Sequence, residues 1–350
     1  MNRPMKVGFV STEAQEQTFF KLQLPEHELE FADLIGKVSA DIEILSVFIY
    51  DKIDRSFLDA HRAIRLICTR STGFDHIDLG ACAERGILVS NVPSYGESTV
   101  AEHTLALILM LSRRIRESIL AGQDPKLSMA AIRGFDLKGK TLGVVGTGRI
   151  GLHVIRLACA FGMEVRAFDV APQLHMCDLL GFRYTTMECL LEQCLILSLH
   201  CPLHPENYHF LNRDAFAKCR KGVIIINTAR GSLIDTGALL EALDSGIVAG
   251  AGLDVLEDEL ATLRRSPEEL KKQINQEAHQ SPEEDRLKEP QKIRELQALA
   301  QNKALIERAN VIFTPHVAFN SVEALRRINA TTSMNIQTFV NGSPSNLIQH

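Results

Sequence analysis

Short apolar segments alternate with helix-like segments over residues 1–98 of the chain. The apolar segments are typical of buried strands, and strands separated by helices predict a parallel sheet with crossover connections. They read KVGFV, EILSVFIY ending at Tyr50, IRLICTRS ending at Ser71, and ILVSN ending at Asn91. The pattern breaks at NVPSYG, and a long helix is then expected at about residues 100–121, with Ser98 or Thr99 as its cap.

The alternation of strands and helices begins again at Lys138. Six apolar segments follow, which predicts a second, doubly wound parallel sheet. They read TLGVV, EVRAF, CLILSLHCP, GVIIINTARG, GIVAGAGLDV and NVIFTPH. Between the last two, residues 256–309 are rich in charge and their leucines keep partial helical spacing, so a helical surface insertion is expected.

A last helix with one apolar face is expected at residues 321–340, and it would return the chain to the first sheet. The predicted fold class is therefore α/β, with two Rossmann-like or flavodoxin-like doubly wound parallel-sheet domains. Residues 1–98 and 321–350 would form a discontinuous substrate domain, and residues 99–320 a dinucleotide-binding domain. The active site is expected in the cleft between the two.

A glycine-rich turn follows the first strand of the second sheet. Gly146, Gly148 and Gly151 have the G-x-G-x-x-G spacing, in which the glycines allow a tight turn, close approach of a pyrophosphate and close packing of the helix on the strand. Helix-compatible residues begin with Arg149 and Ile150, so free N–H groups at the helix start would face the anion. This motif is common, and its context, a strand before and a helix after, favours a dinucleotide site.

An acidic residue ends the next apolar segment. Asp169 lies 18 positions after Gly151, where a carboxylate can accept hydrogen bonds from the adenosine ribose. The alternative is an ordinary loop or capping aspartate. Val170 and Ala171 follow it and provide no arginine for a 2′-phosphate, which favours NAD over NADP.

Composition excludes several classes of function. The net charge is −5, and no basic stripe is long enough to bind nucleic acid. The longest apolar run, at residues 105–111, is far shorter than the roughly 18 residues of a membrane span, and the N-terminus has no signal-peptide pattern. The eight cysteines form no C-x-x-C pair. We therefore expect a cytoplasmic protein with reduced cysteines, no disulfides and no metal.

Three polar residues follow strands of the second sheet: Arg230, Glu259 and His316. Each alone has an ordinary structural explanation. Together, beside a dinucleotide site, they have the chemistry that reduction of a 2-keto acid requires. An arginine can polarise the keto oxygen and pair with a carboxylate. A histidine can donate a proton, and a neighbouring glutamate raises its pKa and fixes its tautomer.

The chain resembles the D-isomer-specific 2-hydroxyacid dehydrogenase family, and within it most of all the NAD-dependent D-lactate dehydrogenases. The resemblance covers nearly the whole chain. It is carried by SVFIYDK, RSTGFDHIDL, NVPSY with VAEHTLALIL, GTGRIG, LHCPL, INTARG, GLDVLEDE and TPHVAF.

The resemblance implies that Arg230, Glu259 and His316 are the catalytic set and that the N–H groups of Thr72 and Gly73 hold the substrate carboxylate. It also implies a side-chain pocket, an NAD site and a homodimer formed through the cofactor domains. The pocket would be lined by Tyr50, Tyr95 and Phe319, and NAD would contact Cys201, Pro202, Asn207, Thr228, Ala229, Arg230 and Asp254.

Departures from the lactate enzymes leave the substrate open. Thr72 replaces a usual valine, Gly96 and Glu97 replace serine and proline, and Asn320 replaces a frequent tyrosine. The alternatives are a longer-chain 2-hydroxy acid, glyoxylate or hydroxypyruvate. Phosphoglycerate is disfavoured by the short stretch after the last strand, formate by the glutamate of the trio, and an NAD-sensing corepressor by the absence of a long tail.

Overall fold

We describe a computed structural model of the chain, which covers residues 3–122, 129–130, 132–257, 259 and 289–348. The chain divides into two compact units. Unit 1 comprises Met1–Gly96 and Asn320–His350, and unit 2 comprises Glu97–Phe319. Among the described residues, no helix combines the length and apolar character that a membrane-spanning segment requires.

Unit 1 is built on a five-stranded parallel sheet with strand order β2-β1-β3-β4-β5. The order reverses between β1 and β3, as in flavodoxin-like sheets. The strands are β1 (Lys6–Val10), β2 (Glu28–Ala32), β3 (Ile44–Val47), β4 (Leu66–Thr69) and β5 (Leu88–Ser90). The strand β2 is not among the predicted segments, although its residues ELEFA alternate polar and apolar side chains as an edge strand does.

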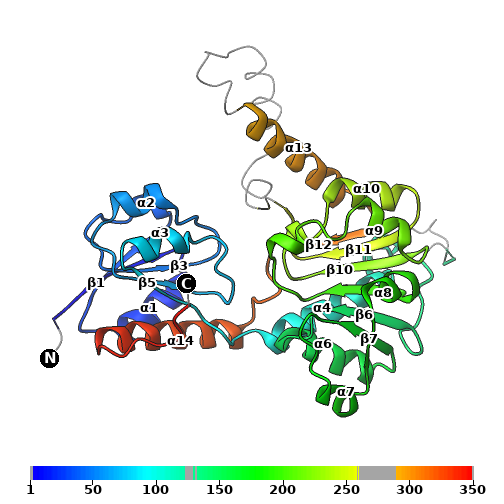
Figure 1. The fold of residues 1–350 in the computed structure, drawn as a ribbon, viewed down its shortest axis with the longest axis horizontal. Coiled ribbons are helices and arrows are strands. Elements are labelled where there is room, and N and C mark those ends of the chain that lie inside the picture. Colours follow the sequence, from blue (N-terminus) through cyan, green and yellow to red (C-terminus); the bar gives the residue numbers. More distant parts are fainter. Residues whose placement is uncertain (1–2, 123–128, 131, 258, 260–288, 349–350) are drawn as a thin grey trace. The chain divides into compact units, whose positions relative to one another are not determined.

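Helices cover both faces of this sheet (Figure 1). On one face, Leu45 and Ile67 pack with Leu58 in a core beneath α2 and α3. On the other, Ile44 and Leu66 pack beneath α1 and α14. The alternation of side chains along each strand therefore supplies both cores. The helices are α1 (Ala14–Gln23), α2 (Arg55–Ala60), α3 (Leu79–Glu84) and α14 (Val322–Val340).

The last helix of the chain begins as the sequence predicts. The Ser321 side chain accepts a hydrogen bond from the Ala324 N–H at 3.1 Å, which caps α14. After α14, the Ile348 N–H donates to Val89 O at 2.9 Å. The C-terminal segment thus adds a short antiparallel bridge beside β5.

Unit 2 is built on a seven-stranded parallel sheet with strand order β12-β11-β10-β9-β6-β7-β8. The order reverses between β6 and β9, which is the switch point where Rossmann-like sheets bind ligands. Six strands coincide with predicted segments, and the seventh, β8, has only two residues. The strands are β6 (Thr141–Val145), β7 (Glu164–Phe168), β8 (Arg183–Tyr184), β9 (Ile196–Leu199), β10 (Val223–Asn227), β11 (Val248–Leu253) and β12 (Val311–Phe313).

Two helical layers enclose the sheet of unit 2. Leu105 of α4 and Val154 of α6 pack on one face, and Leu190 of α8 and Leu239 of α10 pack on the other. The two parallel-sheet units establish the predicted α/β fold class. The helices of unit 2 are α4 (Glu97–Ser112), α5 (Ile115–Ala121), α6 (Arg149–Ala160), α7 (His175–Leu180), α8 (Met187–Gln193), α9 (Arg213–Lys218), α10 (Thr236–Asp244) and α13 (Glu289–Ile306).

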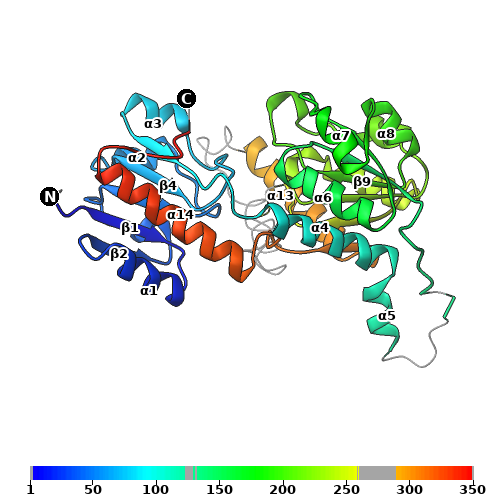
Figure 2. The same ribbon diagram turned by 90° about the horizontal axis from the view of Figure 1, so that it is seen from below.

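The long helix expected at residues 100–121 differs from the prediction in two ways. It begins earlier, at Glu97, so Ser98 and Thr99 lie inside α4 and do not cap it. It is also interrupted: Arg114 has a left-handed backbone with φ 50°, and α5 starts anew after it. Figure 2 shows α5 continuing from the end of α4 away from the sheet of unit 2. An apolar pattern persists across such a break, so periodicity alone does not reveal it.

Of the insertion expected at residues 256–309, the structure describes the beginning and the end. Helix α13 forms its last part, and Leu299 and Leu305 are buried. Residues 258 and 260–288 lie outside the described residues.

Candidate active site

The glycine turn after β6 requires glycine at two of its three positions. Gly146 has φ 95°, and a Cβ there would lie 2.6 Å from the Cys201 nitrogen in the loop after β9. A Cβ on Gly151 would overlap the Gly146 carbonyl. Gly148, in contrast, has open space where its Cβ would be. The first and third glycines therefore allow close packing, and the middle one leaves the start of α6 accessible. Arg149 and Ile150 form the first turn of that helix.

Asp169 lies directly after β7, the strand next to β6. Its Oδ2 accepts from the Thr147 N–H at 2.5 Å and from Thr147 Oγ1 at 2.9 Å, and its Oδ1 accepts from the Ala171 N–H at 2.8 Å. Burial raises the pKa of this carboxyl, but the hydrogen bonds more than offset it, and the pKa is lowered overall. The carboxylate is ionised at neutral pH and is held beside the glycine turn.

The loop after β9 lies across the switch point from the glycine turn. Asn207 fixes this loop: its Nδ2 donates to Pro202 O at 2.9 Å, and its Oδ1 accepts from the His204 N–H at 2.7 Å. Burial raises the pKa of the Cys201 thiol to about 11, so this side chain is a neutral, apolar contact at neutral pH.

A tight turn after β10 carries Arg230. Asn227, which is fully buried, accepts from the Ala229 N–H at 3.0 Å and donates to Arg230 O at 2.8 Å. The guanidinium of Arg230 donates to Ala229 O at 2.7 Å. A Cβ on Gly231 would overlap the backbone of Leu256. The turn therefore packs directly on the segment that leads to Glu259.

His316 and Glu259 form a hydrogen-bonded pair. The distance from His316 Nδ1 to Glu259 Oε1 is 2.5 Å, and Glu259 Oε2 accepts from the Leu256 N–H at 3.2 Å. A carboxylate only accepts, so Nδ1 carries the proton and Nε2 is the ring nitrogen left to exchange a proton with another molecule. Both side chains are largely shielded from solvent, at 20% and 17% exposure.

The His316 backbone is held in a left-handed conformation, with φ 53°. Its N–H donates to Asp254 O at 2.8 Å, and the next two N–H groups, of Val317 and Ala318, donate to the Asp254 carboxylate at 3.0 and 2.9 Å. Such a conformation persists only when its surroundings fix it. Asp254, which is 1% exposed, provides that constraint.

Unit 1 presents a different set of groups at the carboxyl edge of its sheet. Ser71 O accepts from the Val92 N–H at 3.0 Å, and Thr72 O accepts from Asn91 Nδ2 at 2.9 Å. The peptides are trans, so the N–H groups of Thr72 and Gly73 point to the opposite side. Within the described part of the chain neither N–H has an acceptor. Two adjacent N–H donors of this kind are available to an anionic ligand.

Two tyrosines follow the neighbouring strands of unit 1. Tyr50 comes after β3, with its ring 5.1 Å from that of Phe48, and Tyr95 comes after β5, with its carbonyl accepting from Arg327 Nε at 2.7 Å. The structure therefore brings four of the five predicted substrate residues to one edge of unit 1. Phe319 belongs to unit 2, where it is 9% exposed and follows the His316 loop.

Residues 105–318 match the NAD-binding domain of the D-isomer specific 2-hydroxyacid dehydrogenases. The chain belongs to this family. The D-lactate dehydrogenase of Escherichia coli K12 is 37% identical over 265 residues, which cover 73% of this chain and 80% of that protein. A glyoxylate reductase of Thermofilum pendens is 39% identical over 224 residues, which cover 63% of this chain and 66% of that protein. A structure of D-lactate dehydrogenase from Aquifex aeolicus, complexed with NAD and lactic acid, has a TM-score of 0.81 and 34% identity, covering 96% of both chains.

As a member of this dehydrogenase family, the protein is an NAD-dependent oxidoreductase that acts on the CH–OH group of 2-hydroxy acids. The turn at the switch point of unit 2 fits the cofactor. Gly148 leaves open the space at the start of α6 that a pyrophosphate would need, and Asp169, held beside the turn, is the kind of acceptor to which a ribose hydroxyl would donate. Among the described residues, no three histidine, cysteine, aspartate or glutamate side chains gather as a metal site.

Sequence reasoning does not find several residues that hold the His316 loop and the Arg230 turn in place. Thr314 donates to Asp254 Oδ1 at 2.5 Å, and the His103 Nε2 lies 2.9 Å from Thr314 Oγ1. His103 thereby connects α4 to the His316 loop. Asn227 likewise holds the Arg230 turn through its hydrogen bonds. Their positions could have indicated these three residues, because they lie in or beside the motifs VAEHT, INTARG and TPHVAF.

Proposed function

We propose that this dehydrogenase reduces pyruvate to D-lactate with NADH. The observation that supports it best is the pair of His316 and Glu259, on a loop clamped by Asp254. With Nδ1 committed to the carboxylate, the protonated imidazole has Nε2–H to donate. Bound NADH would supply the hydride for the keto carbon. Donation of the Nε2 proton to the keto oxygen would balance that hydride, and the histidine would regain a proton from solvent.

The other residues take separate roles in this proposal. Arg230 polarises the keto oxygen and pairs with the carboxylate, because its planar fork can do both. The N–H groups of Thr72 and Gly73 hold the carboxylate, and the rings of Tyr50, Tyr95 and Phe319 surround the substrate's side chain. In the cofactor site, Gly146, Gly148, Arg149, Ile150, Gly151 and Asp169 would contact NAD, together with Cys201, Pro202, Asn207, Thr228, Ala229, Arg230 and Asp254.

The hydroxyl of Thr72 supports a substrate pocket of the lactate type. Thr72 stands where those enzymes usually have valine, but its Oγ1 donates to Val92 O at 2.9 Å. A hydroxyl engaged in this way has no proton left for the substrate, so towards the pocket the side chain acts much as a valine does. A hydroxymethyl substrate such as hydroxypyruvate therefore gains no donor from this position.

The test is a steady-state assay of NADH oxidation with pyruvate, a longer-chain 2-keto acid, glyoxylate and hydroxypyruvate. We expect the highest kcat/KM for pyruvate. A higher value for another acid would leave the reaction type intact and replace the substrate. No turnover of any of the four would refute the proposed function.

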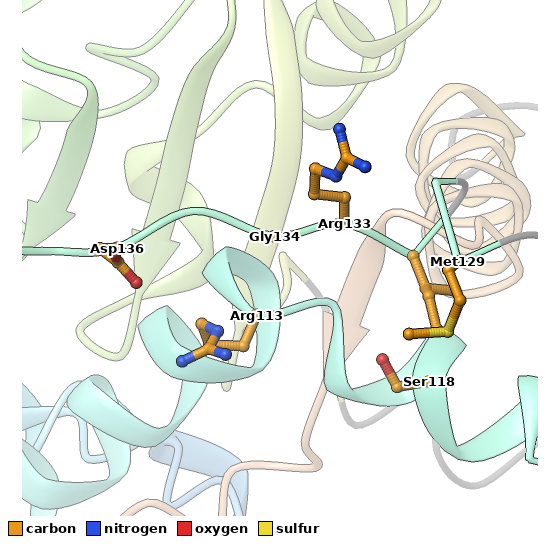
Figure 3. Close-up of a pocket in the computed structure, with 7 residues that line it drawn as sticks. Arg113, Ser118, Met129, Arg133, Gly134 and Asp136 are labelled. Atoms are coloured by element: carbon orange, nitrogen blue, oxygen red, sulfur yellow. The ribbon is translucent and has the colours of Figure 1, made fainter.

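We also infer that the enzyme is a cytoplasmic homodimer. Helix α5 exposes Ile119 and Leu120 at 62% and 56%, and Met129 nearby is exposed at 78%. Met129 lines a hollow of about 420 Å³ on unit 2, which Figure 3 shows between α5 and the segment that leads to β6, and Ile119 directly follows Ser118, another residue of its lining. Exposed apolar side chains next to a hollow are typical of an interface between subunits. All eight cysteines are free, which suits a reducing compartment.

A further inference from the structure

Arg70 is a buried cation in unit 1 that the proposed mechanism does not use. It directly follows β4, and its side chain is only 2% exposed. One guanidinium nitrogen, Nη2, donates to both Val10 O and Ser11 O at 2.8 Å, and Nη1 lies 3.4 Å from Ser46 Oγ. In the sheet order β1-β3-β4, the side chain therefore crosses the end of β3 to reach the end of β1.

The hydrogen bonds of this guanidinium all go to neutral acceptors. Burial lowers the pKa of Arg70 to about 10, and the carboxylates of Glu16 and Asp51 attract it from further away. The side chain thus stays charged at neutral pH. Placing a charge in the interior without a bonded counter-ion is costly. A purely structural bridge between two carbonyls could be made without that charge.

The loop that carries the N–H groups of Thr72 and Gly73 begins directly after Arg70, whereas the guanidinium extends across the end of β3 to the end of β1, along the same carboxyl edge of the sheet. Thr72 and Gly73 follow Arg70 by two and three positions. Their N–H groups point away from residues 91 and 92, which bond to the carbonyls of the same loop. The Ser71 hydroxyl donates to Gly73 O at 2.6 Å, which further fixes the loop. N–H dipoles and a buried cation together raise the local potential at the carboxyl edge of this sheet.

We propose that Arg70 is a positioning residue that also serves as the buried counter-charge for the substrate carboxylate. The inference rests on the proposed function, since it assumes that a 2-keto acid's carboxylate binds to the N–H groups of Thr72 and Gly73. Arg70 holds the carboxyl ends of β1, β3 and β4 in place and contributes its field to the loop. In a buried setting, one nearby charge changes the affinity for a monoanion by about tenfold.

The experiment compares Arg70→Gln, Arg70→Lys and a matched control, Arg65→Gln. Arg65 precedes the same strand at its opposite, amino end and is exposed, so its loss removes the same charge far from the loop. We expect Arg70→Gln to raise the KM for pyruvate and the Kd for the unreactive analogue oxamate by about tenfold. The kcat and the Kd for NADH should stay within about twofold, and Arg70→Lys should recover most of the lost affinity because it keeps the charge.

Unchanged oxamate binding in a folded Arg70→Gln enzyme would overturn the inference, as would an equal loss in the Arg65→Gln control. If Arg70→Gln does not fold, Arg70→Lys decides: near-normal oxamate affinity supports the role of charge, and a tenfold loss contradicts it. Failure of the proposed function would look different. In that case the wild-type enzyme would itself neither bind oxamate nor reduce a 2-keto acid.

Discussion

Asp254 and Asn227 show how buried side chains set up the reactive groups of unit 2. Both Asp254 oxygens accept hydrogen bonds from the His316 loop, and Asn227 closes the turn that carries Arg230. Neither residue needs to react for the site to depend on it. The predicted contact of Asp254 with NAD stays a prediction, and its hydrogen bonds show a second role, that of holding the loop.

Replacing His316 by alanine should abolish most of the turnover. The imidazole is the proton donor of the proposed mechanism, and a positioned acid typically raises the rate by about 10²- to 10⁴-fold.

Replacing Arg230 by lysine should lower kcat and also raise the KM for the keto acid, because lysine keeps the charge but lacks the planar fork. Steady-state kinetics with pyruvate measures both effects. A His316→Ala enzyme with normal kcat would remove the histidine from the mechanism.

Replacing Glu259 by glutamine should act through His316. The carboxylate 2.5 Å from Nδ1 is what commits that nitrogen to carrying a proton and leaves Nε2 facing another molecule. Glutamine has an amide N–H₂ as well as an oxygen, so it no longer fixes this tautomer, and kcat with pyruvate should fall. Glu257→Gln is the matched control: that carboxylate bonds to Tyr208 and His209 instead, and its loss should leave kcat unchanged. A lower kcat in Glu257→Gln beside a normal kcat in Glu259→Gln would identify Glu257 as the partner of His316.

The carboxylate of Asp169 should make the enzyme select NADH over NADPH. It can accept from the ribose hydroxyls and repels a 2′-phosphate. Burial raises the pKa of this carboxyl, but its hydrogen bonds lower the pKa overall, so the group is ionised at neutral pH. Selectivity should therefore be present at neutral pH and be lost in acid, as the carboxylate takes up a proton. Titration of NADH and NADPH into the enzyme gives the two dissociation constants, and Asp169→Ala should reduce the difference between them. Equal affinities in the wild type would remove Asp169 from the site.

At the scale of the element, the glycine turn meets two separable requirements: close packing within the protein and open space for the cofactor. Gly151→Ala should destabilise the fold, because the added Cβ overlaps the Gly146 carbonyl. Gly148→Ala should leave the melting temperature unchanged, since its Cβ would meet nothing within 4 Å. It should nevertheless weaken NADH binding on the order of tenfold (about 1.4 kcal/mol), because the methyl group occupies the space left for the pyrophosphate. Thermal melts and NADH titrations separate the two. A normal NADH affinity in Gly148→Ala would place the pyrophosphate elsewhere.

The strands were predictable wherever both faces are buried. β3, β4, β9 and β10 are runs of apolar residues, which no helix of amphipathic pattern would produce. The edge strands β2 and β8 lack that signal, since β2 alternates and β8 has two residues. The break between α4 and α5 depends on the left-handed Arg114, which the sequence does not mark with glycine or proline.

The candidate site likewise contains residues that the sequence indicates and residues that it does not. Polar residues directly after a strand, such as His316 and Arg230, could be selected from the sequence because the topology places strand ends together. The residues that hold such segments in place could not be selected in this way. His103, Asn227 and Arg70 act through particular hydrogen bonds between segments far apart in the chain, and only the folded arrangement of side chains shows these.

At the scale of the whole molecule, each unit has its own chemistry at the carboxyl edge of its own sheet. Unit 1 presents the N–H donors of Thr72 and Gly73, and the cation of Arg70 is buried at the same edge, which suits an anion. Unit 2 presents the glycine turn, the guanidinium and the histidine pair, which suit a cofactor and a proton transfer. This division agrees with a reaction between a dinucleotide and a small carboxylic acid.

The assembly of the molecule should depend on α5. Ile119→Asp with Leu120→Asp places two charges on the exposed apolar side of this helix, and burying them in an interface is costly. Light scattering of the wild type at micromolar concentration should give twice the 38.9 kDa mass of the chain, and the double variant should give a monomer. Leu22→Asp is the control, because Leu22 is as exposed, at 73%, but lies on α1 of unit 1. A monomeric wild type would contradict the inferred dimer. A dimeric double variant beside a monomeric Leu22→Asp would move the interface to unit 1.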